Sequence, residues 1–242
     1  MVLPLNLAMT AAEMSTCRRL PERIAWMACH FSPYGEGLAN IPAALPPGSM
    51  LILNDRMACS GHSPDLAASQ LADAVRRLRC ESVLLDFQRP VDPESTVMVR
   101  TILATLPCPA AVTASFAEGL SCPVFLSPPP PLHTPLETHL APWKGREVWL
   151  EAALCQEQVT VTESGAQFHP QFPTDDLREG FYEEELCCRY QSRVSDKELC
   201  FTLFDTPETL EKKLDLAQSL GVKRAVGLYQ ELGKHSLTIS SR

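Results

Sequence analysis

The stretch "SPDLAASQLADAVRRLRCESVLLDFQ" (residues 63–88) decides the fold, because it joins a helix directly to a buried strand. Ser63 is a candidate N-cap, and Pro64 suits the first helical position. The apolar residues that follow fall on one helical face, namely Ala67, Leu71, Ala74, Val75 and Leu78. The short apolar run "SVLLDFQ" (82–88) is typical of a buried strand. This segment is therefore predicted to be one helix–strand unit.

The same unit recurs near the other end of the chain. "DTPETLEKKLDLAQSLG" (205–221) has Asp205 or Thr206 as its cap, Pro207 in its first turn and Gly221 as its stop. The strand "RAVGLYQEL" (224–232) follows it directly. A third helix is predicted over residues 92–107, whereas segments 115–121 and 136–145 allow only one or two turns.

Short apolar runs bounded by Pro, Gly, Ser and Asp predict eight strands in all, at residues 2–8, 23–31, 49–55, 82–88, 110–115, 123–127, 147–154 and 224–232. Their alternation with helical or irregular segments is typical of an α/β protein with a parallel sheet. No glycine-rich G-x-G-x-x-G loop follows the first strand, which favours a closed (β/α)8 TIM-type barrel over an open doubly wound sheet. The open sheet remains the alternative at this point.

The segment between the seventh and eighth strands is too long for a single crossover. It contains "QVTVTESGAQF" (158–168), a predicted hairpin with Ser164 and Gly165 at its turn, then an acidic segment and the strand "ELCFTLF" (198–204). We therefore predict an α+β subdomain over residues 156–204, inserted into a barrel domain formed by residues 1–155 and 205–242. The proline-rich run 127–135 is predicted to be a stiff loop.

Composition narrows the classes of partner. The 242-residue chain has a formal net charge of −8 with dispersed acidic residues, which argues against nucleic acid. No apolar run approaches the roughly 20 residues of a membrane span, and the N-terminal segment is a poor export signal, so we expect a cytoplasmic protein without a membrane partner. The ten cysteines include no C-x-x-C pair, and we expect neither a metal site nor a cofactor. The oligomeric state is left open.

Polar residues at the strand ends are the candidate site, since function in such barrels sits at the C-terminal ends of the strands. The fourth strand ends in Asp86, Phe87 and Gln88, which we take as the centre of the site. Candidate substrate-binding residues at other strand ends are Phe31, Asn54, Tyr229 and Gln230.

Two stretches carry a resemblance to a known family. The fourth strand, residues 81–88, lies where the family 18 glycoside hydrolases, the chitinase-like barrels, carry Asp-Gly-x-Asp-x-Asp-x-Glu, and residues 205–233 are similar to their last helix and strand. The position of the insertion also matches, and the branch that acts on spore or cell-wall amino sugars is the most similar. The resemblance implies a barrel that binds an amino-sugar oligosaccharide.

The motif departs from the family where the chemistry is most demanding. The last Asp is retained as Asp86, but the middle Asp is Leu84 and the glutamate that serves as general acid is Gln88. The family's acetamido-holding Tyr-Asp pair would fall near Ser127 and Pro128, and the Trp at the end of the last strand is replaced by Leu228, Tyr229 or Gln230, depending on register. A neutral amide cannot protonate a leaving group, so Gln88 predicts lost or impaired hydrolysis. Whether the protein is an enzyme stays open.

Three hypotheses follow. The first is a catalytically impaired barrel, a pseudoenzyme that still binds amino-sugar glycans or their fragments. The second is an active N-acetylglucosaminidase-type glycosidase whose acid has moved to Glu231, Glu151 or Glu118, with Glu231 preferred because it sits at a predicted strand end. The third is a non-enzymatic scaffold that presents the proline-rich loop 127–135 to a partner.

Overall fold

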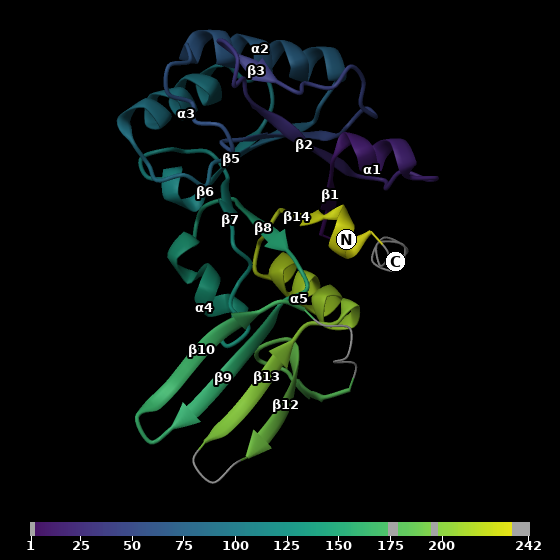
Figure 1. Cartoon of the computed structure of the whole chain (residues 1–242), viewed down its shortest axis with the longest axis vertical. Coiled ribbons are helices and arrows are strands. Elements are labelled where there is room, and N and C mark those ends of the chain that lie inside the picture. Colours follow the sequence, from purple (N-terminus) through teal and green to yellow (C-terminus); the bar gives the residue numbers. More distant parts are fainter. Residues whose placement is uncertain (1–2, 174–178, 195–197, 234–242) are drawn as a thin grey trace.

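Eight parallel strands form a closed barrel (Figure 1) in a computed structural model that describes residues 3–173, 179–194 and 198–233. The strand order is β1-β14-β8-β7-β6-β5-β4-β2, and β2 pairs with β1 to close the ring. The strands are β1 (Leu5–Met9), β2 (Ile24–Phe31), β4 (Met50–Asn54), β5 (Ser82–Asp86), β6 (Ala110–Thr113), β7 (Val124–Leu126), β8 (Val148–Ala152) and β14 (Arg224–Leu228). The predicted barrel is confirmed, and the open sheet is wrong.

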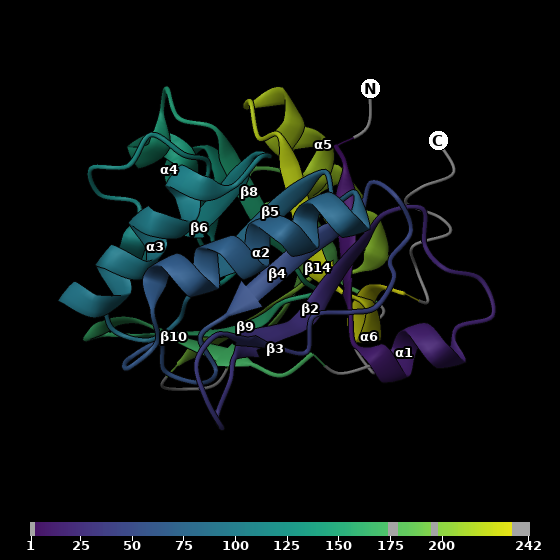
Figure 2. The same ribbon diagram turned by 90° about the horizontal axis from the view of Figure 1, so that it is seen from above.

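The three predicted long helices are present as α2 (Pro64–Leu78), α3 (Pro93–Thr105) and α5 (Pro207–Ser219). Each begins with proline directly after a capping side chain, as for α2, where Ser63 Oγ accepts from the Leu66 amide. Thr206, not Asp205, caps α5. Figure 2 shows α2 and α3 lying outside the strands.

Short elements complete the barrel. They are α1 (Ala11–Thr16), the two-residue strand β3 (Leu38–Ala39) antiparallel to β2, the 3-10 turns η1 (Ala114–Phe116) and η2 (Ala141–Trp143), α4 (Leu136–Leu140) and α6 (Tyr229–Leu232). Helix α1 was not predicted, although Thr10 and Glu13 form a capping box at its start. None of the helices in the described ranges is long and apolar enough to cross a bilayer.

The alternating sides of the strands build two separate apolar cores. Residues that point inward fill the barrel lumen, namely Ala8, Ala25, Met50, Ile52, Leu84, Ala111, Phe125, Trp149 and Val226. Residues that point outward pack against the helices, as Leu85 and Val83 do with the apolar face of α2. The middle of the lumen is therefore filled by packed side chains, and open space is found toward the ends of the barrel.

The last strand is shorter than predicted. It ends at Leu228, and residues 229–232 form α6 instead. Gly227 permits this turn, because a Cβ at that position would lie 2.5 Å from the Leu232 side chain and 2.6 Å from the Ala152 carbonyl oxygen. The fully buried Leu232 thus folds back against the strand. Its apolar character fitted the strand pattern equally well, so periodicity could not separate the two.

The inserted segment forms a five-stranded antiparallel sheet in the order β10-β9-β13-β12-β11, between β8 and β14. Its strands are β9 (Gln156–Thr162), β10 (Gly165–Gln171), β11 (Phe181–Glu183), β12 (Cys188–Val194) and β13 (Leu199–Phe204). The predicted hairpin is β9–β10, with Glu163 and Ser164 at the turn and Gly165 at a φ of +124°. Part of the acidic segment, residues 174–178, lies outside the described residues, as does Val2 of the first predicted strand.

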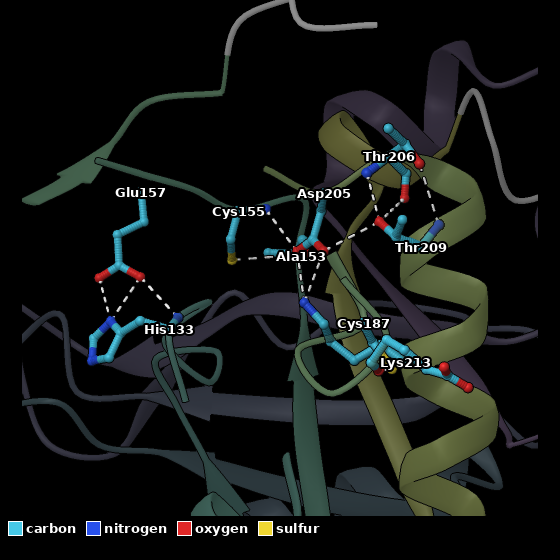
Figure 3. A network of polar contacts seen from close by, with 10 residues as sticks. His133, Ala153, Cys155, Glu157, Cys187, Asp205, Thr206, Thr209 and Lys213 are labelled. Atoms are coloured by element: carbon cyan, nitrogen blue, oxygen red, sulfur yellow. Dashed lines mark hydrogen bonds and ion pairs between the residues drawn. The ribbon is translucent and has the colours of Figure 1, made fainter. Parts of the chain in front are cut away.

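Two polar clusters join the inserted sheet to the barrel (Figure 3). In the first, His133 of the proline-rich loop bonds through Nδ1 to the buried Glu157 carboxylate at 2.8 Å. In the second, Lys213 Nζ of α5 lies 2.8 and 2.9 Å from the two carboxylate oxygens of Asp205, whose side chain is wholly buried. Leu132 is also buried against the sheet, so the loop is anchored at this point.

Candidate functional site

A cavity of about 470 Å³ opens at the C-terminal ends of the barrel strands. Its floor consists of the uppermost lumen residues, including Ile52, Leu84, Phe125 and Val226. Its polar wall includes Thr10, Asn54, Asp86, Gln88, Ser127 and Glu151. An apolar floor below a few converging polar groups is the arrangement expected of a small-molecule site.

Three alternate residues of the fourth barrel strand point into this cavity. Leu84 is in the lumen core, Asp86 ends β5, and Gln88 lies two residues further on. Side chains alternate along a strand, so positions 84, 86 and 88 lie on the same side. The structure thus brings together the three positions at which the sequence was compared with the family motif.

The loop after β5 is held by a buried side chain that the sequence comparison did not single out. Asp55, which is 6% exposed, accepts bonds from the Gln88 amide at 2.9 Å and from the Arg89 amide at 2.8 Å. The Thr113 hydroxyl donates to the Phe87 carbonyl at 2.7 Å. These bonds fix the backbone of the loop and therefore the points from which Asp86 and Gln88 project. The only signal for Asp55 in the sequence was its position directly after a strand.

A chain of polar side chains crosses the cavity mouth from β5 to β8. Gln88 Nε2 donates to Asp86 Oδ1 at 2.6 Å and lies 3.4 Å from Ser127 Oγ, and the Ser127 hydroxyl acts against burial to lower the pKa of Glu151. Burial raises the pKa of Asp86, and the charge of Asp55 adds to this, while the bond from Gln88 opposes it. Burial also raises the pKa of Glu151, with further contributions from the charges of Asp86 and Glu231. Two partly buried carboxyl groups therefore share one cavity.

The predicted substrate-binding residues fall in different places. Asn54 lines the cavity, with its Nδ2 donating to the Met27 carbonyl at 2.9 Å. Phe31 does not line it, because its ring is wholly buried among the outer core residues and contacts Phe87 edge to face at 5.8 Å between centroids. The side chain of Phe31 belongs to the packing behind the strands.

The residues after the last strand lie on α6. Tyr229 bonds through its hydroxyl to Cys17 Sγ at 3.2 Å, and neither Tyr229 nor the exposed Gln230 lines the cavity. Leu228 occupies the cavity wall instead. The early end of β14 explains this difference, because the helical turn carries these side chains off the strand's inward face.

Of the three carboxylates considered as relocated acids, Glu151 alone lines the cavity. Glu231 is on α6, where partial burial raises its pKa. Its charge also contributes to the raised pKa of Glu151. Glu118 lies beside Arg100 and Phe116 at a separate surface depression. Glu231 was preferred because it was predicted to lie at the end of the last strand. That position is wrong, because β14 ends three residues earlier, at Leu228. Within the described ranges, no three His, Cys, Asp or Glu side chains gather as metal ligands would.

Together, these features define a closed parallel α/β barrel with a polar cavity at the C-terminal ends of its strands. No protein-family model matches the sequence, and no curated protein does. Solved structures match over almost the whole chain. A glycoside hydrolase family 18 N-acetylglucosaminidase from Paenibacillus barengoltzii has a TM-score of 0.60 at 11% identity, with 98% of each chain covered.

Two further solved structures show the same likeness. A family 18 chitinase from Cycas revoluta, solved with (GlcNAc)3, has a TM-score of 0.59 at 10% identity over 98% of this chain and 97% of that one. The spore cortex-lytic enzyme SleL of Bacillus cereus has a TM-score of 0.55 at 12% identity, over 93% and 70%. The chain therefore has the fold of the family 18 barrels, as its sequence indicated.

Proposed function

We propose that this protein is a glycan-binding barrel that takes an amino-sugar oligosaccharide into the cavity and does not hydrolyse it through position 88. The observation that carries the proposal is that Leu84, Asp86 and Gln88 face one cavity on a barrel of family 18 fold. Solved relatives of that fold have been captured with N-acetylglucosamine oligomers. The apolar floor suits the C–H faces of a pyranose ring, and the polar wall suits its hydroxyl groups.

The missing proton donor argues against turnover by the family's route. Gln88 lies on the same face as Asp86 and uses its amide nitrogen to bond to that carboxylate. An amide keeps the shape of a glutamate side chain and can donate and accept hydrogen bonds, but it has no proton to transfer at physiological pH. Binding without hydrolysis is therefore the outcome that this arrangement supports.

A second candidate function, glycosidase activity with Glu151 as the acid, has one observation in its favour. Glu151 lines the cavity, and burial raises its pKa toward the range useful to a general acid. The scaffold hypothesis has less support, since the cavity is open and its proposed docking loop is anchored by Leu132 and His133.

Release of a fluorescent aglycone from an N-acetylglucosamine oligomer tests these alternatives in the wild type, Gln88→Glu and Glu151→Gln. We expect a silent wild type and a gain of about 10²–10⁴-fold over it in Gln88→Glu, the usual contribution of general acid catalysis. Turnover by the wild type that Glu151→Gln abolishes would instead establish the second candidate. Glu118→Gln is the matched control, because Glu118 lies outside the cavity.

A further inference from the structure

The cavity is lined by more acidic than basic side chains, and this imbalance limits which ligands it can bind. Asp55, Asp86 and Glu151 line it, while Arg56, an exposed residue, is the cation among the described lining residues. His30 has both ring nitrogens occupied, with Nδ1 2.6 Å from the Phe31 carbonyl oxygen and Nε2 3.0 Å from the Asn40 amide nitrogen. Partial burial of Asp86 and Glu151 disfavours their ionised forms, and a cationic ligand between them would offset that cost.

The three acids differ in how far they are already satisfied. Asp55 accepts from two backbone amides and is a structural group of the loop. Asp86 accepts one side-chain bond, from Gln88, through Oδ1. Burial raises the pKa of Glu151, the Ser127 hydroxyl acts to lower it, and the charges of Asp86 and Glu231 raise it further. Asp86 and Glu151, on strands β5 and β8, are therefore the two carboxylates with acceptor capacity left for a ligand.

The hydrogen-bonding chemistry of this pair favours a donor over an acceptor. An ionised carboxylate only accepts hydrogen bonds, and the neighbouring Gln88 amide nitrogen already donates to Asp86 Oδ1 and lies 3.4 Å from Ser127 Oγ. An acetamido group is neutral and offers this pair a single N–H donor, while its carbonyl oxygen gains nothing from the two carboxylates. A protonated primary amine has three donors, no acceptor and the opposite charge.

We propose that the cavity selects amino sugars that carry a free, protonated amine, which sits between the carboxylates of Asp86 and Glu151, over their N-acetylated counterparts. This inference rests on the proposed glycan-binding function and names its ligand class. The cavity itself is set by the barrel architecture, and the two carboxylates determine what enters it. The neighbouring charged groups, Asp55, Arg56 and Glu231, make the surroundings net acidic and add to the preference.

The test is equilibrium binding, by calorimetry at neutral pH, of a glucosamine tetramer and an N-acetylglucosamine tetramer to the full chain. We expect the glucosamine tetramer to bind at least about tenfold more tightly, and Glu151→Gln and Asp86→Asn each to weaken it by about tenfold, because hydrogen bonds to charged groups are among the strong ones. Glu118→Gln is the control for general attraction of a cation to an acidic protein, and it should bind like the wild type.

The outcomes separate the two proposals. If the N-acetylated tetramer binds as well or better, the inference is overturned while the glycan-binding function stands. If neither tetramer binds to a protein that melts normally, the glycan-binding function itself fails and the inference fails with it. If all variants bind the glucosamine tetramer equally, the attraction is non-specific and the inference is again overturned. Matching melting temperatures across the variants show that the substitutions have left the fold intact.

Discussion

The acidic residues at the two ends of the barrel differ in whether they are paired with arginine side chains. At the N-terminal end, Glu81 is paired with Arg224 and with Arg23 at 3.1 Å, and Arg224 also lies over the Trp149 ring and 3.2 Å from Ser82 Oγ. At the C-terminal end, Asp86 and Glu151 face a cavity, and among the residues that the structure describes their side-chain partners are the neutral Gln88 and Ser127. The acid at the first end is held by ion pairs, and the acids at the second are those that we propose bind a ligand.

The junction with the inserted sheet follows the pattern of the N-terminal end. The side chain of Asp205 is wholly buried, accepts hydrogen bonds from Lys213 and from the Cys155 amide, and has its charge balanced by Lys213 (Figure 3). Proteins commonly give up stability where binding needs unpaired groups. The structural acids of this protein are therefore held by a cation or, like Asp55, by two backbone amides, whereas the candidate functional acids Asp86 and Glu151 have neither within the described part of the chain.

The largest expected effect comes from breaking the buried pair at the junction. Lys213→Met leaves the Asp205 carboxylate buried without its cation, which should lower the free energy of unfolding by about 3–5 kcal/mol. Urea denaturation would measure the loss. Lys212→Met, one position away on α5, is the control, because its pair with Glu208 at 3.5 Å is exposed and should contribute less than about 1 kcal/mol. Equal losses in both variants would contradict the distinction.

A smaller loss is expected at the N-terminal end of the barrel. Arg224→Met removes the partner of Glu81 and the cation over Trp149, and Arg224 is itself only partly exposed. We expect a loss of about 2 kcal/mol, between the values for surface and buried pairs. Arg76→Met, which breaks an exposed pair with Asp73 on α2, should change stability by no more than about 0.5 kcal/mol. An unchanged Arg224→Met protein would mean that this cluster is not structural.

The smallest expected change in the free energy of unfolding is an increase, and it concerns Glu151 in the cavity. Burial raises the pKa of Glu151 above its unfolded value, so the folded protein binds more protons in the intervening pH range. The contribution of Glu151 to stability is full below the unfolded pKa and is lost as pH rises through the folded pKa. Glu151→Gln should therefore be as stable as the wild type in acid and more stable at neutral pH, by up to about 1 kcal/mol.

Urea denaturation of the two proteins between pH 4 and pH 7 would show whether their difference grows with pH, as expected. The nearby groups Asp86 and Glu231 are unchanged in the variant. A Glu151→Gln protein that is less stable than the wild type at neutral pH would show that Glu151 is a structural acid like Asp205. Asp86→Asn should behave in the same way, since burial also raises the pKa of Asp86.

Local sequence signals were sufficient for most of the barrel. Helices α2, α3 and α5 each combine a capping residue, an early proline and an apolar face. The eight short apolar runs bounded by turn residues are typical of buried strands. The end of the last strand could not be predicted in the same way. Its outcome depends on the fit of Leu232 against Gly227, a contact that exists only after β14 and β8 have paired.

The candidate site was predictable along a strand but not between strands. Leu84 and Asp86 share one side because side chains alternate along β5, and Gln88, two residues beyond Asp86, faces the same cavity. The contacts that run from Gln88 through Ser127 to Glu151 connect the ends of β5, β7 and β8. The role of Asp55 depends on hydrogen bonds from residues that are 33 and 34 positions away in the sequence. Phe31 illustrates the converse, since a strand-end aromatic can point to either side of the barrel wall and this one points outward.

The most direct test of the central claim is calorimetric binding of amino-sugar tetramers to the wild type and to Gln88→Trp. The indole would fill the cavity mouth, while the backbone amide of residue 88 could still donate to Asp55. We predict saturable binding at one site in the wild type and none in Gln88→Trp, with similar melting temperatures for both. Undiminished binding in Gln88→Trp, or its absence from a folded wild type, would show that the C-terminal cavity is not a ligand site.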